Sequence, residues 1–459
     1  MPSATTGSAA ASAPDEVRVE HVPPGPNSLA NLEKVQQRIG RTNYAGLYGI
    51  TLCHGHGAYV RDVDGNSYLD CLTGASANVL GYGRGDVLEA YTEAAQAIQH
   101  TCLLYTPNLP VVDLAQRLIQ ITPGDFEKRA IFGVSGSDAT GGTLQIMRRY
   151  TRELSVIHFR DAYHGSTGLS QQASGFPTLK QGIYRPSIEF ISVDFPTTRE
   201  ASDRVLKEVE THLQTGRVGG LIAEVIQGDG GVKVPPQDFF PRLRELLTHY
   251  EALLVADEVQ SGMGRTGRWW AIEHEGVLPD LLATAKGLSA GYAPISAVVG
   301  REEVVNALDP AQELFTYGGH PPSAAAALRC IQAIEEEALI ENASKRGAEL
   351  LTGLRAIQQD YPDILLDARG RGLMLGLEVR VDDFPWRAKV FATRGVELGV
   401  YFGYFGSRNQ VIRIEPPLVI GEREVEIILN TVQRVADEMR TGKIPPITYE
   451  NTLRYGIGL

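Results

Sequence analysis

Two short apolar runs in the second half of the chain each end on a charged side chain. Residues 253–256 (LLVA) lead to Asp257, and residues 281–285 (LLATA) lead to Lys286. Runs of this length predict strands that are buried on both faces. In open α/β sheets, ligands bind beyond the carboxyl ends of such strands. The sequence therefore predicts an α/β fold in which a carboxylate and an amine reach one site.

An amine and an acid in this arrangement suit pyridoxal phosphate. A lysine can hold the aldehyde of this cofactor as an imine, and a carboxylate can keep its ring nitrogen protonated, so that the ring withdraws electrons. A single Asp or Lys at a strand end is usually a solvated loop residue. The pair of Asp257 and Lys286 is therefore more informative than either residue alone.

The residues around this pair form longer motifs. D-E-V-Q-S-G-M-G-R-T-G begins at Asp257, and A-K-G-L surrounds Lys286. These motifs resemble those of the class III (ω-) aminotransferase family of fold-type I pyridoxal-phosphate enzymes. The resemblance implies that Lys286 is the Schiff-base lysine, that Asp257 is the partner of the ring nitrogen, and that Gln260 is hydrogen-bonded to the ring hydroxyl. Residues 262–267 also spell G-x-G-x-x-G, but a dinucleotide site would need this motif directly after the strand.

A candidate phosphate loop lies earlier in the chain. Residues 129–134 predict a strand, and S-G-S-D-A at residues 135–139 predicts the start of a helix. Free N–H groups and the positive end of the helix dipole favour a phosphate there, with Gly136 allowing close approach and Ser137 adding a hydroxyl. The motif resembles the phosphate loop of the family. It is followed by Thr140 and two glycines, Gly141 and Gly142, which are unusual within a helix.

Two further motifs follow predicted strands. In Y-H-G-S-T, the resemblance implies that Tyr163 stacks on the ring beside His164. In E-V-I-Q-G-D-G-G, Glu224 is the first acid, and Asp229 stands where the family usually has Glu. The Asp form resembles the subgroup of isoleucine 2-epimerase and α-amino-ε-caprolactam racemase, and implies that Asp229 helps to move the Cα proton. A structural acid that caps the turn is the alternative.

The last two candidate site residues lie beyond Lys286. F-T-Y-G-G-H-P resembles a family loop that reaches the cofactor phosphate of the neighbouring subunit, with Thr316 in the binding place and His320 replacing the usual Asn. This implies a homodimer or higher oligomer with shared active sites. R-I-E-P-P-L-V-I resembles the motif whose Arg binds a substrate carboxylate, so Arg413 is expected to do so through a bidentate fork. A plain surface arginine is the alternative.

The resemblance extends over about residues 45–440 and implies a fold-type I pyridoxal-phosphate transferase. The expected architecture is a large domain with a central, mostly parallel seven-stranded sheet, plus a smaller α+β domain. The expected division is given by residue numbers: 1–26 a disordered N-terminal arm, 27–75 a segment that contributes to the small domain, 76–325 the large pyridoxal-phosphate-binding domain, 326–445 the small domain and 446–459 a C-terminal tail.

Composition limits the partners. The chain has 43 Lys and Arg against 55 Asp and Glu, a net charge of −12, which disfavours nucleic acid and anionic membranes. No apolar run is long enough to span a bilayer. Its four cysteines are far apart and include no C-x-x-C, which favours reduced thiols in a cytoplasm. His54 and His56 lack partners at ligand spacing, so no metal is expected.

The function that the resemblance implies is transfer of an amino group between an amino acid or amine and a keto acid. The alternative is an amino-acid racemase or epimerase that uses Asp229, or a β/γ-replacement or C–C bond-forming relative. A cofactor-free binding protein on the same fold would be expected to have lost Lys286. The aminotransferase, racemase, epimerase and replacement interpretations all imply an enzyme that acts on small molecules and needs pyridoxal phosphate.

Overall fold

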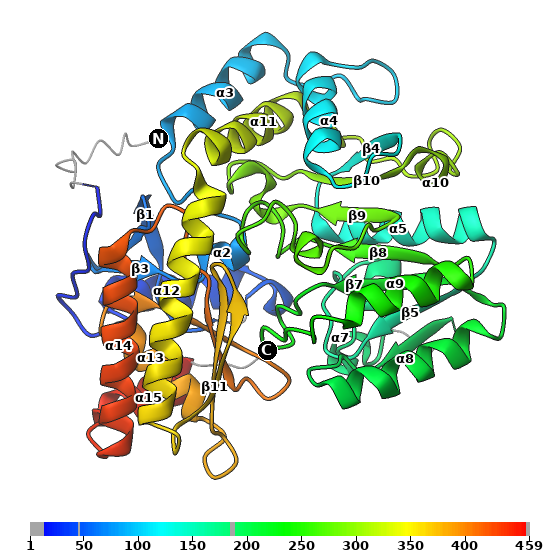
Figure 1. Ribbon diagram of the computed structural model, residues 1–459. Helices are drawn as coiled ribbons and strands as arrows, with labels where there is room; N and C mark the ends of the chain where they lie inside the picture. Colours follow the sequence, from blue (N-terminus) through cyan, green and yellow to red (C-terminus); the bar gives the residue numbers. More distant parts are fainter. Residues whose placement is uncertain (1–12, 45, 184–188, 456–459) are drawn as a thin grey trace.

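One seven-stranded sheet lies at the centre of the molecule, with its strands in the order β4-β10-β9-β8-β7-β5-β6 (Figure 1). The computed structural model describes residues 13–44, 46–183 and 189–455. In sheet order, the strands are β4 (Lys128–Gly133), β10 (Ser296–Arg301), β9 (Leu281–Thr284), β8 (Leu253–Asp257), β7 (Val218–Glu224), β5 (Ser155–Phe159) and β6 (Phe190–Val193). Only β10 runs antiparallel to its neighbours. The predicted mostly parallel sheet is confirmed.

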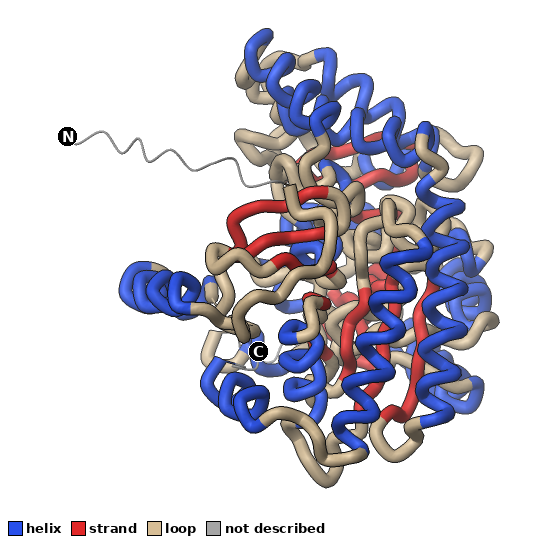
Figure 2. Tube along the Cα trace, turned by 90° about the vertical axis from the view of Figure 1, so that its left-hand side faces the viewer, coloured by secondary structure: helices blue, strands red, loops and turns tan. Residues whose placement is uncertain are grey.

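Both faces of this sheet are covered by helices, as the sequence of β8 predicts. Leu253 and Val255 pack into one hydrophobic cluster, whereas Leu254 and Ala256 pack into another on the opposite face. Successive side chains of a strand point to opposite faces, so a run that is apolar throughout needs cover on both. The covering helices are α5 (Gly136–Thr151) on one face and α8 (Arg199–Leu213) and α9 (Phe239–His249) on the other. The side view in Figure 2 shows strands enclosed among helices.

Three helices pack together beyond the β4 edge of the sheet. They are α3 (Gly85–Ala97), α4 (Leu109–Ile121) and α11 (Pro321–Glu336). Figure 1 shows α3 and α11 side by side above the sheet, and the two helices make extensive contacts. The expected boundary at residues 325/326 falls within α11, and the division into domains stays a prediction.

The last third of the chain forms an antiparallel sheet with helices against it. Its strands, in spatial order, are β11 (Leu365–Arg371), β12 (Met374–Val379), β15 (Val411–Ile414) and β14 (Gly403–Phe405). Its helices are α12 (Leu339–Asp360), α13 (Arg387–Glu397) and α14 (Glu422–Arg440). This region lies beside the large sheet in Figure 1, so that β15 brings its end toward the strand ends of that sheet.

A small sheet brings together strands from the N-terminal and C-terminal parts of the chain. It consists of β1 (Leu52–His56), β2 (Tyr59–Asp62), β3 (Ser67–Asp70) and β13 (Val400–Tyr401). β2 and β3 pair antiparallel and form a hairpin, and β13 adds to β3 in parallel. Of the expected N-terminal arm, residues 1–12 lie outside the described residues. Arg18 forms a β-bridge with Ser67, so this part of the arm lies against the sheet.

The remaining helices lie at the ends of the described chain or are short. They are α1 (Pro26–Arg38), α2 (Thr73–Ser76), α6 (Gly168–Ala173), α7 (Pro177–Lys180), α10 (Glu302–Val305) and α15 (Pro446–Tyr455). In the described part of the chain, no helix combines the length and the apolar character needed to cross a bilayer.

Candidate functional site

The two strands that end on charge are neighbours, and their ends open on one cavity. β8 and β9 run parallel, with Asp257 opposite Ala283. Lys286 follows two residues beyond β9 and has a φ of 36°, a left-handed value that is uncommon for a residue with a side chain. Backbone strain of this kind clusters at functional sites. Asp257 and Lys286 both line a cavity of about 180 Å³.

Most of the site residues predicted from the sequence meet in this cavity. The predicted residues that line it are Gly136, Ser137, Tyr163, His164, Glu224, Asp257, Gln260 and Lys286. Gly165 and Val259 complete the lining. Asp229, Thr316 and Arg413 are not among the lining residues. The cavity thus gathers the ends of β5, β7, β8 and β9 and the start of α5.

Lys286 faces an amide oxygen. Its Nζ donates a hydrogen bond to Oε1 of Gln260 at 3.2 Å. Gly228 makes room for this oxygen, because a methyl group added at Gly228 would lie 2.3 Å from it. Gln260 is therefore held close to the lysine by the turn that follows β7.

Asp257 is buried and paired with His164. Its Oδ2 lies 2.7 Å from Nδ1 of His164, and its Oδ1 accepts a hydrogen bond from the backbone N–H of Val259 at 3.1 Å. An ionised carboxylate only accepts hydrogen bonds, so Nδ1 of the imidazole carries the shared proton. Nε2 of His164 is buried without a hydrogen-bond partner. The contact with His164 fixes the direction of the Asp257 carboxylate at the cavity wall.

Glu224 ties two loops together at the cavity wall. One carboxylate oxygen accepts a hydrogen bond from the N–H of Tyr163 at 3.0 Å, and the other accepts one from the N–H of Gly228 at 3.1 Å. Burial raises the pKa of the Glu224 carboxyl to about 7, and the charge of Asp257 adds to this rise. Glu224 therefore positions the backbone of Tyr163, the predicted stacking residue.

The start of α5 forms a cradle at the other end of the cavity. Ser135 caps the helix by accepting a hydrogen bond from the N–H of Asp138, which leaves the N–H groups of Gly136 and Ser137 without a helical partner. A methyl group added at Gly136 would lie 2.8 Å from Cγ1 of Val259, so only glycine fits there. These groups around one cavity fit pyridoxal phosphate. The lysine can hold its aldehyde, the buried acid can hold its ring nitrogen, and the N–H cradle can hold its phosphate.

Asp229 and Arg413 form an ion pair with each other. Nη2 of Arg413 donates to Oδ1 of Asp229 at 2.6 Å, and the guanidinium lies 3.5 Å from the ring centre of Phe405. Arg413 is fully buried, and its Nη1 has no hydrogen-bond partner. Burial would raise the pKa of Asp229, but the charges of Arg413 and Lys286 outweigh burial and lower it. Nε also has no hydrogen-bond partner, so Arg413 is a buried cation with donors still available.

Thr316 is exposed and does not reach the cavity of its own chain. In the same loop, His320 precedes α11, with its Nδ1 2.9 Å from Oγ of Ser323 in the first turn of that helix. The replacement of the family's Asn by His320 thus lies at a helix start. The role of Thr316 stays a prediction.

One of the two unusual glycines of α5, Gly142, has a neighbour from this loop. Glu313 is hydrogen-bonded to Gln145, and a methyl group added at Gly142 would lie 3.1 Å from its Oε1. Gly141 has open space around the same position. Close approach of Glu313 therefore accounts for Gly142 but not for Gly141.

One buried acid at the site had no predicted role. Glu415 lies between Arg413 and two prolines and is fully buried, with its carboxylate on the amide of Gln260. Its position in the R-I-E-P-P motif was the only sequence signal, since its partner is 155 residues away. Among the described residues, no group of three or more His, Cys, Asp or Glu side chains is arranged to hold a metal ion.

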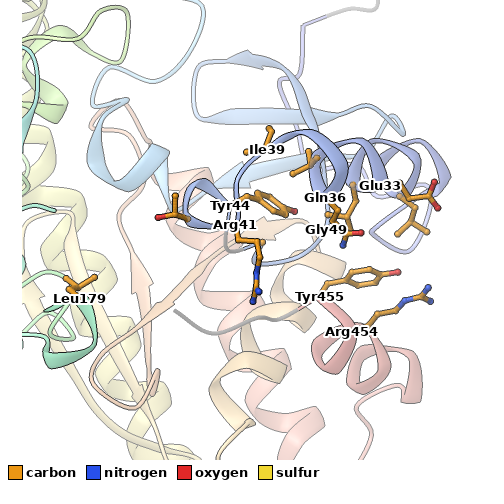
Figure 3. Close-up of a pocket in the computed structure, with 14 residues that line it drawn as sticks. Glu33, Gln36, Ile39, Arg41, Tyr44, Gly49, Leu179, Arg454 and Tyr455 are labelled. Atoms are coloured by element: carbon orange, nitrogen blue, oxygen red, sulfur yellow. The ribbon is translucent and has the colours of Figure 1, made fainter. Parts of the chain in front are cut away.

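A wider hollow, of about 890 Å³, lies away from these residues, between α1 and α15 (Figure 3). Ile39 and Tyr44 contribute to it from the N-terminal segment, and Arg454 and Tyr455 from the C-terminal helix. Of the described residues, no lysine and no buried acid line it. The chemistry of the site therefore belongs to the smaller cavity at the strand ends.

Comparison with known proteins agrees with this geometry. Residues 42–436 match the family model described as aminotransferase class-III. The chain is 34% identical to an alanine/serine racemase of Pyrococcus horikoshii (92% of this chain, 93% of the relative) and 35% identical to an acetylornithine aminotransferase of Methanopyrus kandleri (86% and 95%). A solved ornithine aminotransferase from Toxoplasma gondii, with partial occupancy of PLP at its active site, has a TM-score of 0.82 at 27% identity (90% and 95%). The chain belongs to the class III aminotransferases, a family of pyridoxal-phosphate enzymes.

Proposed function

We propose that the protein transfers an amino group between an amino acid or amine and a keto acid, with Lys286 as its catalytic residue. The observation that supports this most directly is the meeting of Lys286 and Asp257 in one cavity, delivered by neighbouring parallel strands. When bound, pyridoxal phosphate supplies an electron-withdrawing ring conjugated to the substrate amine. The protein must then hold the ring, orient the substrate and move a proton.

Lys286 is proposed to hold the cofactor and afterwards to move the proton at Cα of the substrate. It lines the same cavity as the buried Asp257, and the charge of the half-buried Asp229 acts on it. Asp257 is proposed to keep the ring nitrogen protonated, with His164 on its second oxygen to prevent the carboxylate from turning away. Gln260 accepts from the lysine side and is proposed to contact the ring hydroxyl.

The phosphate and the ring faces are assigned to the rest of the cavity. Gly136 and Ser137 are proposed to bind the phosphate through the start of α5. Tyr163, positioned by Glu224, is proposed to stack on one face of the ring, and Val259 to pack on the other. Backbone N–H groups and a dipole suit a dianion without a lysine or arginine.

Arg413 is proposed to bind the carboxylate of the substrate. The unpartnered Nη1 can donate to one carboxylate oxygen while Nη2 is shared with Asp229. A buried guanidinium binds a carboxylate strongly because water does not compete for its donors. An amine that has no carboxylate would leave Nη1 of Arg413 without a hydrogen bond, which disfavours such an amine as a substrate.

Racemisation is the second candidate, because the chain is about as similar to an alanine/serine racemase as to an acetylornithine aminotransferase. That reaction needs a second proton-moving group on the face opposite Lys286, and Asp229 is the candidate. The Arg413 ion pair and the lowered pKa of Asp229 keep this acid ionised near neutral pH. An ionised Asp229 with a lowered pKa is a poor proton donor, and its ion pair with Arg413 also makes it a weak base, which favours amino transfer.

A dimer with shared active sites belongs to the same proposal. Tyr105, Leu109 and Tyr317 are exposed by 79%, 78% and 58%, and His100 stacks on Tyr317 at 4.7 Å, so the segments around residues 100 and 317 meet where apolar side chains are exposed. Exposed apolar surface of this kind marks interaction sites. Thr316 lies within it, where it can reach a cofactor phosphate of a second copy. The free state of all four cysteines supports a cytoplasmic location.

The test combines labelling with product analysis. The purified protein is treated with borohydride and digested, and a phosphopyridoxyl mass is expected on the peptide with Lys286, absent in Lys286→Ala and retained in a control variant of the exposed Lys443, Lys443→Ala. Lys286→Ala should lose about 1,000-fold in turnover. Amino acids are then incubated in D₂O with and without a keto acid. A keto product supports amino transfer, whereas deuterium at an inverted Cα without keto product contradicts it and supports racemisation.

A further inference from the structure

Glu415 is a fully buried acid at the end of β15, and three groups surround its carboxylate. Ser76 donates its hydroxyl to Oε2 at 2.6 Å, and Nε2 of Gln260 lies 2.9 Å from Oε1 and 3.1 Å from Oε2. Nε of Arg413 is 3.8 Å from Oε1. The acid therefore stands between the residue that faces the catalytic lysine and the residue proposed to hold the substrate.

We propose that Glu415 is a positioning residue that fixes the orientation of the Gln260 amide. Through that amide, Glu415 sets how firmly the nitrogen of Lys286 holds its proton. An ionised carboxylate accepts hydrogen bonds and donates none, so Gln260 must turn its NH₂ group toward Glu415. The amide oxygen then points the other way, where it accepts from Nζ of Lys286 at 3.2 Å. An amide in the opposite orientation would place a donor against the lysine.

The same carboxylate also sets the position of Arg413. The guanidinium has Asp229 at its Nη2 and Glu415 near its Nε, so a carboxylate lies on each of two sides. A buried cation is stable only when its charge is compensated. Glu415 keeps part of that compensation in place while the free Nη1 turns to a substrate. This step rests on the proposed role of Arg413.

Charge adds to orientation in the expected effect on the lysine. The titratable groups that line the cavity around Lys286 are Asp257, Glu224, His164 and Tyr163, with Asp229 and Arg413 beside them. Those that face Glu415 are Arg413 and Arg265. Replacing Glu415 by Gln leaves all of these groups in place and removes one negative charge. It also allows the Gln260 amide to turn.

The experiment follows the visible absorption band of the holoenzyme as a function of pH. In Glu415→Gln, loss of a nearby negative charge and of the acceptor that Lys286 uses disfavours the protonated form, so the pH midpoint of the band is expected to fall by about half a unit or more. The KM of an amino acid is expected to rise about tenfold, with a smaller change for an amine that lacks a carboxylate.

Glu275→Gln is the matched control, since Glu275 is also buried and paired with an arginine, Arg371, at 2.6 Å, but lies outside the cavity. It is expected to keep the midpoint and KM of the wild type. A wild-type midpoint in folded Glu415→Gln would overturn the proposal and leave Glu415 as a structural acid. If the wild type itself shows no visible band, the proposed cofactor role of Lys286 fails instead.

Glu415→Asp provides a second variant in case the amide prevents folding. It keeps the charge but withdraws the carboxylate by one methylene, so that Gln260 is held less firmly. The midpoint is expected to move in the same direction by a smaller amount, and the KM of the amino acid is expected to rise. An unchanged midpoint together with an unchanged KM would overturn the proposal as well.

Discussion

The two sides of the cavity treat buried acids in opposite ways. On the side of the large sheet, neither Glu224 nor Glu258 forms an ion pair with an arginine or lysine of the described residues, and burial raises the pKa of each to about 7. On the side of the C-terminal sheet, Arg413 compensates Asp229, and the pKa of that acid is lowered despite burial. The first group is braced by backbone N–H groups, and the second is held by charge.

This difference indicates how the site divides its work. Hydrogen bonds from the backbone fix a position without adding a charge, which suits the walls of a site that must hold a ring in one place. An ion pair between side chains can exchange one partner for another of the same sign, which suits a site that must admit and release a carboxylate. Changes on the two sides should therefore affect different kinetic constants.

The largest effect is expected on the side of the large sheet. Asp257→Asn keeps the shape of the side chain and a contact to His164, but removes the charge that stabilises the protonated ring nitrogen. Loss of one such electrostatic contact should lower kcat about 100- to 1,000-fold with little change in KM. Steady-state kinetics with saturating cofactor measure this. A change confined to KM would remove the proposed difference between the two sides.

The side of the C-terminal sheet should respond mainly in KM. Arg413→Met is combined with Asp229→Asn, so that Asp229 is not left as a carboxylate without its cation. The KM of an amino acid should rise about 10- to 100-fold, as expected for loss of a charged hydrogen bond, whereas an amine without a carboxylate should be little affected. If both substrates suffer equally, Arg413 supports the fold rather than the substrate.

The buried acids of the large sheet predict a dependence of stability on pH. The ordinary pKa of 4.5 for Glu258 is raised to about 7 by burial, so between these values the folded chain binds the proton more tightly than the unfolded chain. The free energy of unfolding should therefore fall as the pH rises through this window. Glu258→Gln cannot ionise and should remove up to about 3 kcal/mol of this fall.

Denaturant unfolding of wild type and Glu258→Gln at pH 5 and pH 8 checks this expectation. The hydroxyl of Ser261, which donates to Glu258 at 2.5 Å, can turn to accept from the amide of the variant. The two proteins should differ more at pH 8 than at pH 5, with the variant favoured at the higher pH. A difference that is the same at both pH values would show that folding does not raise the pKa of Glu258.

The smallest effect is expected at Gly142 in α5. Alanine favours a helix over glycine by about 1 kcal/mol, but the new methyl group would lie 3.1 Å from Glu313. Gly142→Ala is therefore expected to change stability by less than about 1 kcal/mol. A methyl group at Gly141 has open space, so Gly141→Ala should gain most of the difference in helix propensity between alanine and glycine. Thermal unfolding of both variants compares them. An equal gain at both positions would show that Glu313 yields freely.

Residues next to strand ends were predictable, and pairs across the two regions were not. Asp257, Glu224 and Lys286 each follow an apolar run, and parallel strands bring such ends to one edge by rule. Asp229 and Arg413 were identified separately, but their pairing joins residues 184 apart, for which local patterns give no signal. Glu415 was missed for the same reason. The single antiparallel strand β10 was not predicted either, since an apolar run fits a parallel and an antiparallel strand equally well.

The antiparallel strand β10 sets a distance that a bound molecule must span. β10 pairs Ser296 with Gly133 of β4 and Ala297 with Thr284 of β9, so the ends of β4 and β9 stand level, separated by the width of one strand. Two strand spacings amount to about 10 Å. β10 thus acts as a spacer between the segments that lead to the phosphate cradle and to the lysine. Any molecule that engages both must be long and rigid enough to bridge that gap.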